Sequence, residues 1–68
     1  MEKKTGLERA LIKVEGRLAA YSEKAHKAIR EHAWSMAACY EAALFGLHTA
    51  EMILKDEIEQ ETLNAKEN

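Results

Sequence analysis

The sequence has no proline and only three glycines among its 68 residues. These two residue types interrupt helices most strongly, so the composition favours long, unbroken helical segments. Alternating β-branched residues between clusters of turn residues, the usual signature of strands, are also missing. About one residue in six is alanine, the strongest helix former. The composition therefore predicts an all-α protein.

Cysteine is scarce as well, since Cys39 is the only one in the chain. One thiol cannot form an internal disulfide, and a single cysteine is compatible with the reducing cytoplasm, where we expect the protein to act. A chain of 68 residues buries only a modest core and usually needs a staple or association with another chain. Disulfides are excluded as that staple.

The sequence also lacks an excess of charge of one sign and any long apolar run. A formal net charge of -2 is not the basic balance typical of nucleic-acid-binding domains. No segment has about 18 uninterrupted apolar residues, so we expect no membrane span. The N-terminal MEKKTGLERA is basic but has no apolar run behind it, so we expect no signal peptide.

The most apolar stretch is residues 33–54, AWSMAACYEAALFGLHTAEMIL, which three strongly polar residues interrupt: Glu41, His48 and Glu51. A helix of this kind is apolar on most of its circumference and must be covered on several sides. One neighbouring helix cannot cover it, so the sequence predicts a homo-oligomer, in the simplest case a dimer. The residues expected in the oligomer core are Met36, Cys39, Tyr40, Ala43, Gly46, Leu47, Ala50 and Leu54.

A first helix is predicted over about residues 7–31. Thr5 followed by Glu8 fits a capping box, in which the Thr5 hydroxyl accepts a hydrogen bond from a first-turn amide and Glu8 accepts one from the Thr5 amide. Apolar residues then recur every three or four positions, as along one face of an amphipathic helix. These residues are Leu7, Leu11, Val14, Leu18, Tyr21, Ala25 and Ile29.

A second helix is predicted over about residues 36–61, followed by a polar tail, residues 62–68, that is expected to fray. Gly46 lies inside this helix at a cost of about 1 kcal/mol relative to alanine, for which close approach of a neighbouring backbone is the usual reason. Cys39 has small apolar neighbours and is expected to be buried. The apolar stripe of this helix is Met36, Tyr40, Ala43, Leu47, Ala50, Leu54 and Ile58.

The turn between the two helices has no clear signal. No Gly, Pro or Asn lies between Glu31 and Ser35, and the two stripes are nearly in phase across this interval. One long helix in a coiled coil is therefore an alternative to a hairpin. Ser35 can cap the second helix, but Ser22 can cap a further helix start equally well, which would give a three-segment chain.

The charge distribution favours an antiparallel arrangement, which a hairpin or an antiparallel dimer of single long helices would provide. We prefer the hairpin because two helices of about 25 residues each match in length and in stripe. Residues 1–32 hold eight Lys and Arg against five acids, whereas residues 33–68 hold two Lys against seven acids. An antiparallel pair brings the basic start, with Lys3 and Lys4, beside the acidic end, where both helix dipoles would otherwise be unfavourably placed. The sequence thus predicts a single domain, residues 1–68, folded as an antiparallel two-helix hairpin that dimerises into a four-helix bundle.

One pair of residues resembles a metal-binding arrangement. Glu23 and His26 form an E-x-x-H, and a dimer could add Glu41 from each second helix, which is the ligand set of di-iron and di-manganese bundles. An E-x-x-H in a charged helix is common by chance, so solvated surface residues are the preferred interpretation. We predict no metal and no other cofactor.

Two surfaces are candidates for contact with a partner. Glu41, His48 and Glu51 share one strip of the second helix, which is most simply the side facing water but could also form a polar contact. At the turn end, Trp34 could be an exposed aromatic contact residue, with His32 and Arg30 beside it.

No arrangement of catalytic residues is present, so we predict a protein that is not an enzyme. The leading hypothesis is a small helical interaction protein (a regulator, inhibitor or adaptor) that acts as a homo-oligomer on a larger protein partner. One alternative is a metal-binding bundle that uses Glu23, His26 and Glu41. The other is nucleic-acid binding along a basic ridge of the first helix, which comprises Arg9, Lys13, Arg17, Lys24 and Lys27.

Overall fold

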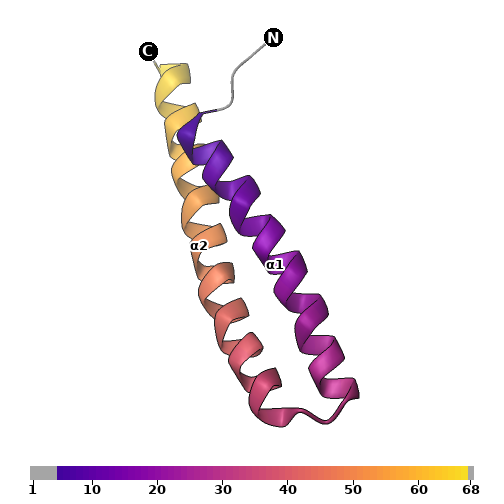
Figure 1. Cartoon of the computed structure of the whole chain (residues 1–68). Helices are drawn as coiled ribbons and strands as arrows, with labels where there is room; N and C mark the ends of the chain where they lie inside the picture. Colours follow the sequence, from indigo (N-terminus) through magenta and orange to yellow (C-terminus); the bar gives the residue numbers. More distant parts are fainter. Residues whose placement is uncertain (1–4, 68) are drawn as a thin grey trace.

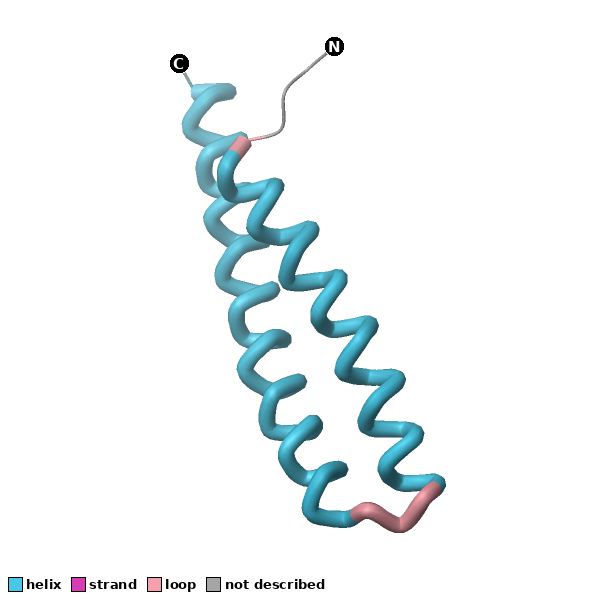
Figure 2. The backbone as a smooth tube through the Cα atoms, in the orientation of Figure 1, coloured by secondary structure: helices cyan, strands magenta, loops and turns pink. Residues whose placement is uncertain are grey.

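The computed structural model describes residues 5–67 and contains two antiparallel helices, α1 (Gly6–Arg30) and α2 (Trp34–Glu67), which lie side by side (Figure 1). A turn of three residues joins them, and both ends of the described chain lie at the opposite end of the pair, where α2 extends past the start of α1 (Figure 2). The predictions of an all-α protein and of a helical hairpin are confirmed. The single long helix and the three-segment chain are wrong.

The first turn of α1 has the predicted capping box. The Glu8 amide donates to the Thr5 hydroxyl and the Thr5 amide donates to the Glu8 carboxylate, both at 3.1 Å. Each bond satisfies an amide that has no acceptor within the helix. This reciprocal pair sets the first residue of α1 at Gly6.

α1 ends through a left-handed residue that is not glycine. His32 has φ 58°, and two backbone bonds close the helix end: the Ala33 amide donates to the Ala28 carbonyl at 2.8 Å, and the His32 amide donates to the Ile29 carbonyl at 3.1 Å. Together these bonds form a Schellman motif. Histidine is among the few non-glycine residues enriched in this conformation, which explains why the turn forms without the usual signal.

α2 differs from its predicted bounds at both ends. It begins at Trp34, so Ser35 lies inside the first turn, and the backbone bond from the Ala37 amide to the Ala33 carbonyl opens the helix. The residues expected to fray are helical as far as Glu67, and the Thr62 hydroxyl donates to the Ile58 carbonyl at 3.0 Å. No glycine or proline ends the helix earlier, and Lys66 in the last turn is favourable to the helix dipole. Asn68 lies outside the described residues.

The two helices pack along a pair of heptad seams, in which spacings of three and four alternate as in a coiled coil. Tyr21 and Tyr40 face each other at mid-seam, with ring centroids 5.9 Å apart. The α1 seam contains Leu7, Leu11, Val14, Leu18, Tyr21, Ala25 and Ala28, and the α2 seam contains Ala37, Tyr40, Leu44, Leu47, Glu51, Leu54 and Ile58.

The predicted stripes are displaced by one residue near the turn. Ala28 is 4% exposed and takes the seam position expected for Ile29, which is 42% exposed. Ala37 is 6% exposed and likewise replaces Met36, which is 54% exposed. Alanine at these positions lets the two helices approach closely where the short turn joins them.

Among the described residues, no ion pair joins α1 to α2, although the sequence led us to expect attraction between the two oppositely charged helices. Both ion pairs found there lie within α2, where Glu51 contacts His48 at 3.8 Å and Lys55 at 3.7 Å. Lys3 and Lys4 lie outside the described residues. The seam and the turn therefore account for the antiparallel pairing without ion pairs between α1 and α2.

The core of the hairpin is very small. Leu18, Ala25, Ala28 and Ala37 are its buried apolar residues among those described. The molecule extends 54 × 23 × 13 Å, and its shortest dimension is about one helix diameter. The hairpin is thus one helix thick along its shortest dimension. Among the described residues, neither helix carries an apolar stretch long enough to cross a lipid bilayer.

Candidate interaction surfaces

The turn end presents a stacked aromatic pair. The His32 ring lies on the Trp34 ring with centroids 5.4 Å apart and an angle of 22° between their planes, and Trp34 remains 62% exposed. Arg30, the last residue of α1, is exposed at the same end. The three residues named as a contact surface from sequence are therefore all accessible, and the left-handed His32 conformation holds the two rings together.

The polar strip of α2 is divided between two faces. Glu41 and His48 are exposed, but the Glu51 side chain is only 19% exposed because it occupies a seam position beside α1. His48 and Lys55 hold the Glu51 carboxylate from the same helix. Glu51 is therefore a structural residue of the hairpin and is poorly placed for a partner contact.

The residues predicted for the oligomer core also divide. Five of them are half-buried toward α1, and the other three are exposed. Cys39, expected to be buried, is among the exposed ones. At Gly46 an added methyl group would meet no atom within 4 Å, so the close approach expected there does not occur within one chain. The half-buried residues are Tyr40, Ala43, Leu47, Ala50 and Leu54, and the exposed residues are Met36, Cys39 and Gly46.

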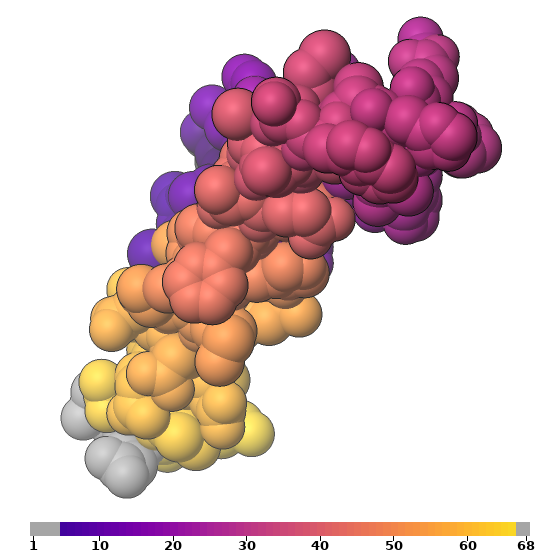
Figure 3. Space-filling model, turned by 90° about the horizontal axis from the view of Figure 1, so that it is seen from below, coloured from indigo at the N-terminus to yellow at the C-terminus, as the bar shows by residue number. Residues whose placement is uncertain are grey.

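The sequence predicts that α2 must be covered on several sides, and the hairpin leaves one apolar side of this helix exposed. Phe45 is 77% exposed, Met52 71% and Ile53 58%, all on the side of α2 away from its seam. α2 covers much of the molecular face seen in Figure 3. Ala38, Phe45 and Met52 recur every seven residues and form a second apolar heptad of α2. We call this surface the outer α2 face; it contains Ala38, Ala42, Phe45, Gly46, Met52 and Ile53.

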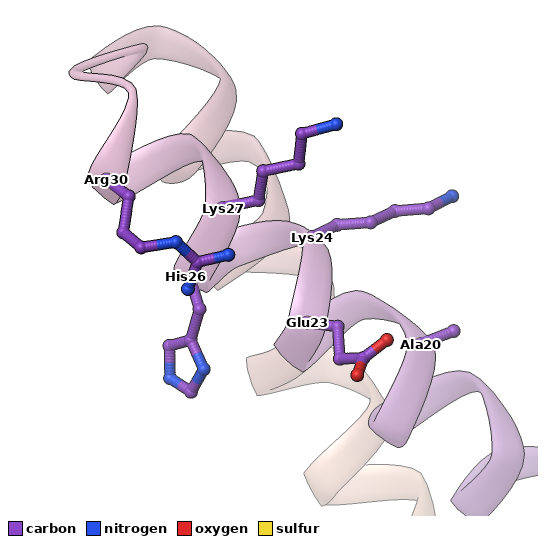
Figure 4. Close-up of a pocket in the computed structure, with 6 residues that line it drawn as sticks. All are labelled: Ala20, Glu23, Lys24, His26, Lys27 and Arg30. Atoms are coloured by element: carbon purple, nitrogen blue, oxygen red, sulfur yellow. The ribbon is translucent and has the colours of Figure 1, made fainter.

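A depression of about 490 Å³ on α1 contains the E-x-x-H pair (Figure 4). All six lining residues belong to α1, so no second element closes it. The side chains of Lys24 and Lys27 extend away from the helix, and His26 leaves it in another direction. The residues that line it are Ala20, Glu23, Lys24, His26, Lys27 and Arg30.

The predicted metal ligands are not brought together in one chain. Tyr21 lies level with Tyr40, so Glu41 lies level with about residue 20 and away from His26. Residues 5–67 contain no group of three or more His, Cys, Asp or Glu side chains placed to hold a metal ion. The alternative of a metal site at Glu23, His26 and Glu41 thus receives no support from the geometry of the hairpin.

Three comparisons, with models of protein families, with curated proteins and with solved structures, found no match to this chain.

Proposed function

We propose that the protein is a small, non-enzymatic helical interaction protein that acts as a homo-oligomer on a larger protein partner, as a regulator, inhibitor or adaptor. The hairpins would associate as a dimer, for which the sequence predicts a four-helix bundle. The lone Cys39 agrees with a cytoplasmic location.

The observation that carries the proposal is the combination of a very small core with large exposed apolar side chains. Among the described residues, four apolar side chains are buried, and three of these belong to alanine. In contrast, Trp34, Phe45 and Met52 are each more than 60% exposed. Scattered exposed apolar residues are ordinary, but a contiguous apolar surface marks a site of interaction. A single-layer hairpin with such a surface is suited to binding other helices.

Contact with the partner is assigned to the turn end. Tryptophan, tyrosine and arginine dominate the energetics of protein interfaces, and Trp34 and Arg30 are both accessible there. His32 already restrains the Trp34 ring by stacking, so little side-chain entropy remains to be lost on binding. Glu41 and His48 are accessible along α2 and could extend the contact.

Affinity capture from host lysate tests this assignment. Wild type is compared with Trp34→Ala and with Ile12→Ala, a control that removes an apolar side chain that is 48% exposed on α1. A protein captured by wild type and by Ile12→Ala should be lost with Trp34→Ala, because a truncated hot spot weakens binding roughly thirtyfold. Circular dichroism checks that all three are helical. Equal capture by all three would contradict the assignment of Trp34, and capture of nothing by wild type would contradict the proposed function.

A further inference from the structure

The two helices differ in how much of their circumference is apolar. α1 has one apolar side, the seam that packs on α2, and its remaining surface is rich in charge. α2 has its seam and, in addition, the outer α2 face, which contains no charged residue. A helix with one apolar side belongs at the outside of an assembly, and a helix with two belongs between two neighbours.

We propose that a second copy of this chain covers the outer α2 face by packing its own α2 there, antiparallel to the first. The two α2 helices are then central and the two α1 helices are peripheral, so the four helices form a row instead of the bundle expected from the sequence. This inference rests on the proposed homo-oligomer, and it specifies which face forms it, in which orientation and in which register.

The exposed area matches what a stable dimer needs. Large apolar and aromatic side chains carry about 150–250 Å² each, so the exposed fractions of Phe45, Met52 and Ile53 amount to roughly 400 Å². A typical interface buries about 800 Å² per partner, of which somewhat more than half, roughly 450 Å², is apolar. The alanines and the glycine of the outer α2 face account for the small difference. One copy of α2 is therefore a sufficient occupant.

Size complementarity sets the register. An antiparallel contact between two identical helices has a two-fold axis, so it buries the whole outer α2 face only when the axis passes through the middle of that face. The face runs from Ala38 to Ile53, and its midpoint lies between Phe45 and Gly46. Phe45 then lies level with Gly46 of the second copy, where an added methyl group would meet nothing within the single chain. The largest side chain of the face thus meets the position with the most room.

The same register puts large residues against small ones at both ends of the contact. Ile53 lies level with Ala38 of the second copy, and Met52 lies level with Cys39. Alternation of this kind allows side chains to interdigitate at close packing density.

Charge selects the antiparallel orientation. A parallel pair would place the acidic ends of both α2 helices together, since Asp56, Glu57, Glu59 and Glu61 occur there. In the antiparallel pair, residues 57–61 extend past the partner's outer α2 face and lie level with its residues 30–34. That end of the partner has one Arg and one Glu, Arg30 and Glu31, so each acidic end is kept apart from the other acidic end.

Light scattering coupled to size exclusion, at micromolar concentration, tests the face. Wild type should have the mass of two chains. Phe45→Glu should raise the dissociation constant of the dimer roughly thirtyfold or more while the chain stays helical by circular dichroism. Ile12→Glu, the same kind of change at an exposed apolar residue of α1, should leave the dimer intact.

Cross-linking tests the orientation and register independently of any effect on folding. In Met52→Cys, mild oxidation with diamide should join Cys39 of one chain to the introduced thiol at position 52 of the other, and peptide mapping should identify this mixed disulfide as the main product. A parallel pair would instead join position 39 to 39 and position 52 to 52. That pattern would overturn the antiparallel register.

The outcomes separate this inference from the proposed function. A wild-type dimer that survives Phe45→Glu, or that Ile12→Glu also dissociates, overturns the outer α2 face but leaves the homo-oligomer standing. Wild type with the mass of a single chain overturns both the outer α2 face as a dimer contact and the proposed homo-oligomer. This holds also if a lysate protein or lipid vesicles are found to bind the face. Loss of partner capture with a dimer still present concerns the proposed function alone.

Discussion

The phenol rings of Tyr21 and Tyr40 pack against each other across the hairpin, with centroids 5.9 Å apart and planes at 35°. Lys24 lies on the Tyr21 ring, its Nζ 5.4 Å from the centroid. Both tyrosines occupy seam positions, and seam residues toward the turn are mainly alanine. This pair is therefore the largest specific contact in the turn half of the molecule.

A double-mutant cycle on this pair should reveal a coupling of about 0.5–1.5 kcal/mol in the free energy of unfolding. The variants are Tyr21→Ala, Tyr40→Ala and the double substitution, compared by urea denaturation at one fixed protein concentration. Tyr21→Phe is the matched control, since it retains the ring and should retain the coupling. Additive effects of the two alanine substitutions would mean that the rings do not contact in solution.

Glu51 is the polar residue in an otherwise apolar α2 seam. Its carboxylate is partly buried and is held by His48 and Lys55, two contacts that are themselves largely exposed and weak. Replacing a partly buried ion pair with an apolar side chain is often stabilising. Glu51→Leu should therefore raise the free energy of unfolding by about 1 kcal/mol.

Glu51→Gln is the control for this substitution, because it removes the charge and keeps the shape and polarity of the side chain. Thermal and urea denaturation should rank Glu51→Leu above wild type and Glu51→Gln at or slightly below it. Destabilisation by Glu51→Leu would contradict this prediction and would mean that the carboxylate stabilises the seam.

Much of the hairpin could be predicted from local sequence features. The Thr5–Glu8 capping box determined the start of α1, because its two hydrogen bonds depend only on residues three positions apart. Helical periodicity identified most seam residues. Periodicity could not decide whether Ala28 or Ile29 lies on the seam, and it could not place Glu51 there. An apolar face is wide enough to include either of two successive helix positions, so the pattern alone does not locate its centre.

The turn and the outer surface were harder to predict for different reasons. His32 adopts a conformation for which glycine is the expected signal, and backbone bonds that no sequence pattern announces hold it there. The sequence predicted that α2 must be covered on several sides, but it could not say which apolar side faces α1. The structure answers this, because it leaves Phe45 and Met52 exposed.

His32→Gly should stabilise the hairpin. A left-handed backbone costs a residue with a side chain about 1 kcal/mol or more, and glycine adopts it without that cost, so we expect a gain of roughly 0.5–1 kcal/mol. Loss of the stack on Trp34 offsets part of this gain. His32→Asn tolerates the conformation partly, whereas His32→Ala keeps the cost and also loses the ring.

The expected order of stability is therefore His32→Gly, then His32→Asn, then His32→Ala, measured by thermal denaturation at one protein concentration. Trp34 fluorescence should change in all three, because each removes the stacked imidazole. If His32→Gly were the least stable of the three, the turn would not have the left-handed geometry described above.

Gly16 and Gly46 provide a matched pair that distinguishes the single hairpin from its dimer. Both lie inside helices, and at both an added methyl group would meet nothing within 4 Å in the single chain. If the hairpin acted alone, each change to alanine should raise the free energy of unfolding by about 1 kcal/mol. In the proposed dimer only Gly46 lies level with Phe45 of the second copy.

We therefore expect Gly16→Ala to show the full gain and Gly46→Ala to lose most of it, with a weaker dimer. Gly46→Leu should dissociate the dimer, because overpacking a close contact costs about 1–3 kcal/mol. Denaturation at two protein concentrations separates the effects, since a loss that arises from the dimer depends on concentration and the helix-propensity gain at Gly16 does not. Equal gains for Gly16→Ala and Gly46→Ala at both concentrations would contradict the packing of α2 on α2, because that packing should penalise the change at Gly46 alone.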